Sequence, residues 1–254
     1  MKKEKSFRVF VIYALLLQFG ILISQQSLLI ESTSTTIPNY NTRDATVQVM
    51  VSYTDPLVNQ SLESAYTGTG AIIADENGWI YVLTARHVCS PNPFHSIYFG
   101  MQENVEIQDI DGNFHDAEIT LISQEDDLCI VKYFSDVNSN RSIAKFSNVP
   151  PNLDSPVFMY AAPAGFYVPS AITRFSGTFS GDAILWGGEH SAVYTMPAAG
   201  GASGAAITNS NGEIIGVLHS TLSDFHHISL STTYDSTINF IEALEEQENI
   251  TILD

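Results

Sequence analysis

The chain has 254 residues, of which 44% are hydrophobic and 15% charged, so it is long enough and apolar enough to form a substantial core. Its formal net charge of −18 disfavours contact with nucleic-acid phosphates, so we expect no nucleic-acid partner. Its two cysteines form no Cys-x-x-Cys pair and share no ligand spacing with the seven histidines. We therefore expect neither a metal nor a cofactor.

The N-terminus has the pattern of a membrane-targeting segment. Four of the ten basic residues lie within residues 1–8, and Val9–Ile23 is an apolar run. This pattern predicts a secretory signal peptide or an uncleaved signal anchor over residues 1–30, with the N-terminus kept in the cytoplasm. We expect the rest of the chain to be extracytoplasmic, either secreted or anchored to the membrane. Residues 31–44, rich in Ser and Thr, are expected to be a linker.

From Thr46 onward, short apolar or alternating runs between turn residues predict a β protein. In the first half we expect strands at Thr46–Tyr53, Gly68–Ala74, Ile80–Thr84, Ser96–Phe99, Val105–Asp109, Ala117–Ser123 and Leu128–Phe134. In the second half we expect strands at Pro156–Ala161, Ile172–Ser176, Ala192–Met196, Gly204–Thr208 and Glu213–His219.

Pro150-Pro151 divides the strand-rich region into halves of similar size. This predicts one β-barrel over residues 45–149, a second over residues 150–246 and a tail over residues 247–254. The second half is expected to close with a helix that Asp235 or Ser236 caps and that runs to about Glu246. Its apolar face would consist of Ile238, Ile241 and Leu244.

Three segments carry candidate catalytic residues, in the order His, Asp, Ser. His87 ends an apolar strand, Asp126 and Asp127 precede another, and Ser203 lies in a run of small residues. A serine hydroxyl becomes a nucleophile when a base takes its proton and an acid orients that base. Each segment alone is more typical of a structural feature. Together, in this order, they indicate a serine nucleophile.

The small residues around Ser203 also suit the binding of an oxyanion. Gly201 and Gly204 permit backbone angles that side chains exclude. The loop would then present the backbone N–H groups of Gly201 and Ser203 to a developing negative charge.

In these motifs the chain resembles a trypsin-like serine peptidase of the chymotrypsin superfamily, in the style of the bacterial Deg-type (high-temperature-requirement) proteases. The resemblance spans roughly residues 45–245. It rests on Gly68-Thr69-Gly70, Thr84-Ala85-Arg86-His87-Val88, Asp127-Leu128-Cys129-Ile130-Val131 and Gly201-Ala202-Ser203-Gly204.

The resemblance implies an all-β fold of two six-stranded antiparallel β-barrels with a C-terminal helix. It implies a serine endopeptidase with a polypeptide substrate, with Ser203 as nucleophile, His87 as general base and Asp127 orienting the histidine. It favours Asp127 over Asp126, because the family's Asp stands directly before an apolar strand.

The chain departs from the family pattern near the serine. Ala202 replaces the Asp that pairs with a freed N-terminus in trypsin, so activation by that route is not expected. Ala205 and Ala206 replace a Gly-Pro pair. His219 stands where many relatives place a Ser or Thr near the catalytic Asp. We consider two roles for it: a hydrogen bond to Asp127, or a place on the substrate edge.

The resemblance also implies where a substrate binds, namely before Ser203 and after Gly216. No acid stands there, which disfavours Arg or Lys before the scissile bond and favours a small or medium apolar residue. The substrate backbone would add as a strand to the His219–Thr221 edge. The expected substrate-binding residues are Met196, Pro197, Ala198, Leu218, His219, Ser220 and Thr221.

Several alternatives stay open at this level. Cys89 and Cys129 form either a disulfide or two buried free thiols. A catalytically inactive trypsin fold that acts as a binding module is the main alternative function, and a structural β protein is another. An α/β-hydrolase is disfavoured, because it needs the order Ser, Asp, His and alternating helices.

Overall fold

A computed structural model of the chain describes residues 40–55, 60–90, 102–135, 141–185, 187–222 and 224–253. The predicted signal segment, most of the linker and the expected strand Ser96–Phe99 lie outside these residues. None of the helices in the described part of the chain is long and apolar enough to cross a membrane.

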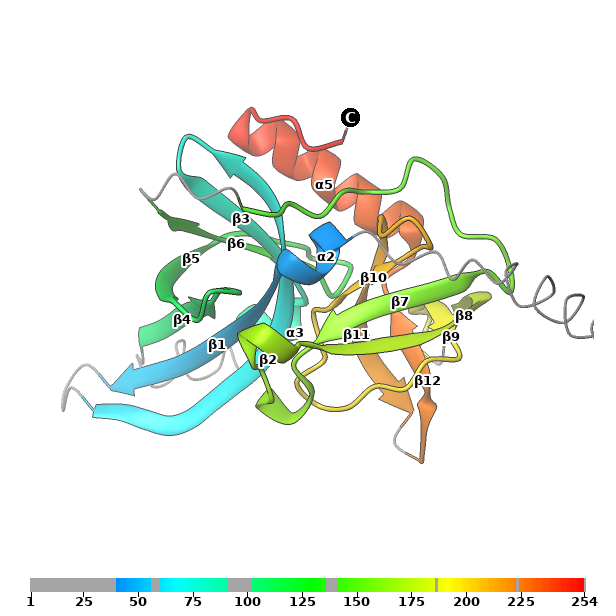
Figure 1. Cartoon of the computed structure of the whole chain (residues 1–254), viewed down its shortest axis with the longest axis horizontal. Helices are drawn as coiled ribbons and strands as arrows, with labels where there is room; N and C mark the ends of the chain where they lie inside the picture. Colours follow the sequence, from blue (N-terminus) through cyan, green and yellow to red (C-terminus); the bar gives the residue numbers. More distant parts are fainter. Residues whose placement is uncertain are drawn as a thin grey trace, which may run out of the picture. The chain divides into compact units, whose positions relative to one another are not determined.

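The first barrel closes in the strand order β1-β2-β3-β6-β5-β4 (Figure 1). Alternate residues of its first strand, among them Val47, Val49 and Val51, are fully buried, as a period of two predicts. Asn77 and Gly78, both with positive φ, make the tight turn between the second and third strands. The strands are β1 (Thr46–Asp55), β2 (Gln60–Glu76), β3 (Trp79–Thr84), β4 (Gln102–Gln108), β5 (Phe114–Ile122) and β6 (Cys129–Phe134).

The second barrel closes in the order β7-β8-β9-β12-β11-β10, which repeats the pairing order of the first barrel. Met159, Tyr194 and Ile207 are fully buried in its core. The expectation of two six-stranded antiparallel barrels with a C-terminal helix is confirmed. The strands are β7 (Pro156–Ala161), β8 (Thr173–Ile184), β9 (His190–Tyr194), β10 (Ala206–Thr208), β11 (Ile214–Leu222) and β12 (Phe225–Ser231).

The sequence pattern missed β12 and gave β8 too short. Phe225, His226 and His227 are exposed, so the first half of β12 has no apolar alternation to reveal it. The strand is fixed instead by its neighbours, because it pairs with β11 on one side and β9 on the other. Closure of the barrel therefore provides the hydrogen bonds that make this segment a strand, although its local sequence does not predict one.

In the part of the chain that the structure describes, four short helical segments connect or precede the strands. Two α-helical turns lie in the first half, one before β1 and one between β3 and β4. Two 3-10 turns lie between β7 and β8. They are α2 (Tyr40–Asp44), α3 (Arg86–Cys89), η1 (Pro163–Gly165) and η2 (Pro169–Ala171).

The closing helix α5 spans Tyr234–Glu248, and its capping residue lies two or three residues before the expected ones. The N-cap is Thr233, not Asp235 or Ser236, because the Thr233 hydroxyl accepts a hydrogen bond from the Ser236 N–H at 3.2 Å. Asn249 ends the helix in the left-handed conformation.

The apolar face of α5 packs against the core of the first barrel. Ile241 and Leu244 are fully buried within that core, and Ile238 is partly buried against it. At the end of the helix Glu248 accepts hydrogen bonds from Lys132 Nζ at 2.9 Å and from the Tyr81 hydroxyl at 3.0 Å. The helix that follows the second barrel in sequence therefore ties the chain back to the first barrel (Figure 1).

Cys89 and Cys129 form a disulfide, with their Cα atoms 6.5 Å apart. Both residues are fully buried. Cys89 lies two residues after His87, and Cys129 lies two residues after Asp127. The disulfide therefore joins α3, which carries the candidate base, to β6, which the candidate acid precedes.

Replacing both cysteines by alanine should lower the free energy of unfolding. The chain-entropy account gives about 4 kcal/mol for a cross-link between residues 40 positions apart. Urea unfolding of Cys89→Ala/Cys129→Ala beside the wild type measures the loss. The fully reduced wild type should unfold at the same urea concentration as the double variant. A wild-type midpoint unchanged by reductant would contradict the cross-link.

Candidate active site

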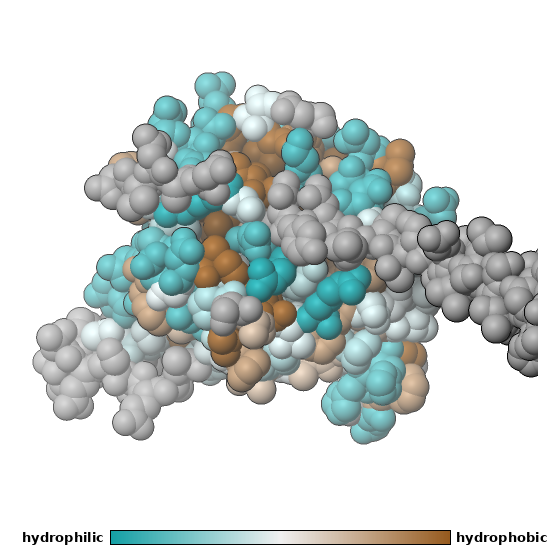
Figure 2. All heavy atoms as spheres, in the orientation of Figure 1, coloured by the Kyte–Doolittle hydropathy of each residue, from teal (hydrophilic) through white to brown (hydrophobic). Residues whose placement is uncertain are grey.

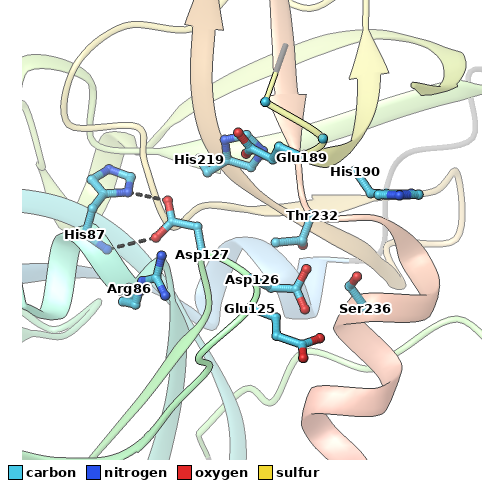
Figure 3. A pocket seen from close by; sticks show the side chains of 12 residues that line it. Arg86, His87, Glu125, Asp126, Asp127, Glu189, His190, His219, Thr232 and Ser236 are labelled. Atoms are coloured by element: carbon cyan, nitrogen blue, oxygen red, sulfur yellow. Dashed lines mark hydrogen bonds and ion pairs between the residues drawn. The ribbon is translucent and has the colours of Figure 1, made fainter. Parts of the chain in front are cut away.

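His87 and Asp127 form a two-point contact between α3 and the turn before β6. The His87 ring Nδ1 lies 2.5 Å from Asp127 Oδ2, and the His87 backbone N–H donates to Asp127 Oδ1 at 2.9 Å (Figure 3). The carboxylate thus holds both the ring and the main chain of the histidine. With Nδ1–H donated to Asp127, the lone pair of Nε2 is left to act as a base.

The environment of Asp127 keeps its carboxyl group ionised. Burial alone would raise the pKa of Asp127, but the hydrogen bonds from the His87 ring and backbone and the charges of His87 and His219 outweigh it. The result is a pKa below the ordinary value for an aspartate. An ionised Asp127 stabilises a protonated His87 ring, which is what an orienting acid must do.

The turn before Asp127 is held by Arg86. The Arg86 guanidinium donates to the Ser123 carbonyl at 3.1 Å and to the Gln124 carbonyl at 3.4 Å. The Asp126 N–H donates to the Ser123 hydroxyl at 3.0 Å, within the same turn. Of the two neighbouring acids, the structure therefore places Asp127 on His87 and leaves Asp126 at the turn.

A pocket of about 690 Å³ opens beside this pair. Figure 3 shows that acids predominate on one side of it, while His219 and Glu189 lie close together on the other. Ser203 is not one of its lining residues. The lining residues are Arg86, His87, Glu125, Asp126, Asp127, Gly187, Gly188, Glu189, His190, His219, Thr232 and Ser236.

Ser203 lies in a loop that has room only for glycine at two positions. Gly201 and Gly204 both have positive φ, at 87° and 85°. A Cβ on Gly204 would lie 2.1 Å from the Thr69 carbonyl oxygen, and one on Gly201 would lie 2.5 Å from that of Ala162. The expectation that the loop needs glycine on both sides of the serine is confirmed.

Among the described residues, the backbone N–H groups of Gly201 and Ser203 have no hydrogen-bond partner, and neither do those of Ala199 and Gly200 just before them. The N–H groups of Ala202, Gly204 and Ala205 all donate to carbonyl groups, at 3.0, 2.7 and 3.1 Å. The N–H groups of Gly201 and Ser203, which are expected to bind the oxyanion, are therefore free of protein acceptors, as that role requires.

The carbonyl groups of the same peptides set the directions of these donors. The Gly200 carbonyl accepts from the Ala164 N–H at 2.5 Å, and the Ala202 carbonyl accepts from the Ala205 N–H. In a trans peptide the C=O and N–H point in opposite directions, so each bond fixes the N–H across its peptide. The role of Ala164 has no sequence signal, since any residue supplies an N–H.

The serine loop packs against the strand ends next to His87. The Thr69 N–H donates to the Ser203 carbonyl at 2.8 Å. A Cβ on Gly68 would meet both that carbonyl and Val88, the residue after His87. Ser203 is half-buried, and among the described residues its hydroxyl makes no hydrogen bond to His87. Catalytic hydrogen bonds are often long before substrate binds.

His219 takes partners that the sequence did not predict. Its side chain is 7% exposed, with Nδ1 2.9 Å from the Ser220 hydroxyl and Nε2 3.3 Å from the Ser191 hydroxyl. Glu189 lies 3.7 Å from Nε2. Within the described part of the chain, no hydrogen bond joins His219 to Asp127. The proposed support through such a bond was wrong, because both ring nitrogens already face serine hydroxyls.

The expected substrate-binding residues divide into two groups. Met196, Ala198 and Leu218 belong to the buried core of the second barrel. Pro197, Ser220 and Thr221 are half-buried, and beyond Leu218 the strand β11 pairs with β12 alone among the described residues. Its other edge is therefore the one that an added strand could use.

Stability should fall as the pH drops below about 6.5, in part because of His219. Burial lowers the pKa of His219 from 6.5, and the charge of His87 lowers it too. The acids Glu189 and Asp127 and a hydrogen bond with the Ser231 backbone raise the pKa, but their effect is smaller. The unfolded ring therefore binds a proton that the folded ring resists. This stabilisation is present above pH 6.5 and lost as the pH falls through the lowered pKa.

The substitution His219→Gln should remove this part of the pH dependence. Urea unfolding at pH 7.5 and 5.0 measures the slope, to which one titrating histidine contributes at most about 1.4 kcal/mol per pH unit. Identical slopes in the wild type and the variant would contradict the assignment.

Comparisons with known proteins place this geometry in a family. Residues 68–217 match the family model described as "Trypsin-like peptidase domain". No curated protein sequence matches the chain. Among solved structures, a serine endoprotease from Yersinia pestis is similar in fold, with a TM-score of 0.61 and 18% identity, over 85% of this chain and 68% of that one. With more than half of its length matched by the family model, the chain belongs to the trypsin-like peptidase domain family.

Proposed function

We propose that the chain is a serine endopeptidase that cleaves peptide bonds through an acyl-enzyme on Ser203. The observation that carries the proposal is the two-point contact of Asp127 with His87 on one barrel, together with a serine loop on the other in which the Gly201 and Ser203 N–H groups are free. An inactive binding module would have no need of a histidine held in this tautomer or of unpaired donors beside a serine.

The reaction follows from these groups. The Ser203 hydroxyl oxygen attacks the substrate carbonyl carbon while His87 Nε2 takes the hydroxyl proton. The N–H groups of Gly201 and Ser203 donate to the resulting oxyanion. The leaving amine takes the proton from His87, and a water molecule, deprotonated by the same nitrogen, then hydrolyses the ester to free Ser203.

The substrate is a polypeptide, and its backbone is proposed to pair with β11 beyond Leu218. Half-buried Ser220 and Thr221 support this placement, since beyond Leu218 their strand pairs with β12 alone among the described residues, and Pro197 is half-buried as well. None of these residues is charged. A small or medium apolar residue before the scissile bond is therefore expected to be preferred over Arg or Lys.

The function is tested with a fluorophosphonate probe, which reacts only with an activated serine, and with peptides that carry Ala, Leu, Arg or Lys before the scissile bond. The wild type should be labelled and should cleave the Ala and Leu peptides best. Ser203→Ala should abolish labelling, and His87→Ala should lower turnover by at least about 10⁴-fold. A folded wild type that is neither labelled nor active would make the inactive binding module the better reading.

The neighbouring acids provide a matched control. Asp127→Asn leaves the size of the side chain unchanged but should lower kcat by about 10⁴-fold, because the histidine is no longer held in the productive tautomer. Asp126→Asn removes the same charge one residue away and should stay within a few-fold of the wild type. Equal effects of the two substitutions would mean that only the local negative charge matters.

We further propose that the folded part of the chain lies outside the cytoplasm, where disulfides persist. The Cys89–Cys129 disulfide and the basic and apolar N-terminal segment support this location. Expressed in a bacterium, the full chain should be found outside the cytoplasm with oxidised cysteines, and the chain lacking residues 1–30 should stay inside. A full-length chain that stays cytoplasmic with free thiols would contradict it.

A further inference from the structure

Thr69, in the middle of Gly68-Thr69-Gly70 on β2, lies where the first barrel meets the serine loop of the second. Its side chain is fully buried. A Cβ on Gly68 would lie 3.0 Å from the Ser203 carbonyl oxygen, so the strand backbone runs directly against the loop. A polar side chain in such a place needs partners for its hydroxyl, and those partners come from the other barrel.

The Thr69 hydroxyl makes two hydrogen bonds across the junction. It donates to the Gly201 carbonyl at 2.9 Å and accepts from the Ala162 N–H at 3.0 Å. The residues it joins are 132 and 93 positions away in sequence. A hydroxyl can donate and accept at once, which no apolar side chain of the same shape can do.

Both partners lead to the donors of the proposed oxyanion site. Gly201 carries one of the two N–H groups expected to bind the oxyanion, and the Thr69 hydroxyl fixes the carbonyl on its other side. Ala162 immediately precedes η1, and in η1 the Ala164 N–H holds the Gly200 carbonyl and so sets the direction of the Gly201 N–H. One hydroxyl thus holds Gly201 from both directions.

Besides these contacts, the segment is held by the turn that the Ala202 N–H closes on the Ala199 carbonyl at 3.0 Å. Gly200 and Gly201 have no side chains, and the φ of Gly201 is +87°, so the orientation of their peptide depends on hydrogen bonds. Ala164 is itself in the left-handed region, with φ +53°, a conformation that a non-glycine residue keeps only when its surroundings hold it there.

We propose that Thr69 is a positioning residue for the oxyanion donors: its hydroxyl, supplied by the first barrel, holds Gly201 and the η1 segment so that the Gly201 N–H points into the site. The inference rests on the proposed function, since it assigns a role within the same catalytic centre. It predicts that the hydroxyl matters for turnover rather than for substrate binding.

The test compares Thr69→Val, which keeps the shape and loses the hydroxyl, with Thr69→Ser, which keeps the hydroxyl. Thr237→Val is the matched control, because Thr237 is equally buried and its hydroxyl also makes two hydrogen bonds, to Thr233 and Thr232, away from the serine loop. Each variant is measured for thermal unfolding, fluorophosphonate labelling rate, and kcat and KM on a peptide substrate. Crystal structures of the wild type and Thr69→Val complete the set.

We expect Thr69→Val to lower kcat and the labelling rate by about 10- to 100-fold, somewhat less than the loss of a whole oxyanion donor, with KM changed by less than about threefold. Thr69→Ser should recover most of the activity. Thr237→Val should lose stability without the selective loss of kcat. In the crystal structure of Thr69→Val, the Gly200–Gly201 peptide should be rotated or disordered.

The outcomes separate this inference from the proposed function. A wild type that is neither labelled nor active overturns the proposed function, and the crystal structures still decide whether Thr69 holds the peptide. An active wild type with wild-type kcat in Thr69→Val, or an unmoved Gly200–Gly201 peptide in that variant, overturns the positioning role. Equal losses in Thr69→Val and Thr237→Val would show that the hydroxyl supports only the fold.

Discussion

The close backbone approach between β2 and the serine loop is the constraint on which the rest of the site depends. Gly204 has space for no side chain at all, since a Cβ there would overlap the Thr69 carbonyl and the Thr84 hydroxyl at 2.1 and 2.2 Å. The two main chains therefore lie close enough to hydrogen-bond to each other, as the Thr69 N–H does with the Ser203 carbonyl. The first barrel therefore determines the shape of a loop that belongs to the second.

The two barrels contribute different parts of the proposed catalytic site. The first supplies His87 and Asp127, which are joined by two hydrogen bonds. The Cys89–Cys129 disulfide cross-links the same two segments two residues further on. The second supplies Ser203 and the free N–H groups. The helix α5 follows the second barrel in sequence but packs into the core of the first, so it links the two barrels.

Hydrogen bonds and charges around Asp127 keep its carboxylate ionised beside His87. In a protein of net charge −18, a half-buried carboxylate beside further acids is costly unless specific donors compensate it. For Asp127 the donors are the ring and backbone of His87, and they outweigh the burial that would otherwise raise its pKa. The ring nitrogens of His219 lie near the Ser191 and Ser220 hydroxyls. Figure 2 shows hydrophilic and hydrophobic residues interspersed over one face of the molecule.

The sequence by itself determined the β class, the two-barrel division, most strands and the order His87, Asp127, Ser203, because these depend on local periodicity, turn residues and short motifs. It also identified Gly201 and Gly204, whose backbone angles only glycine adopts readily. It did not reveal β12, the Thr233 cap or the partners of His219, it left a disulfide and two free thiols as alternatives for Cys89 and Cys129, and it gave Thr69 no role. Apart from the Thr233 cap and the contact of His219 with Ser220, which are local, each of those depends on which distant segments barrel closure brings together. A hydroxyl that bonds residues 93 and 132 positions away acquires its role only in the folded chain.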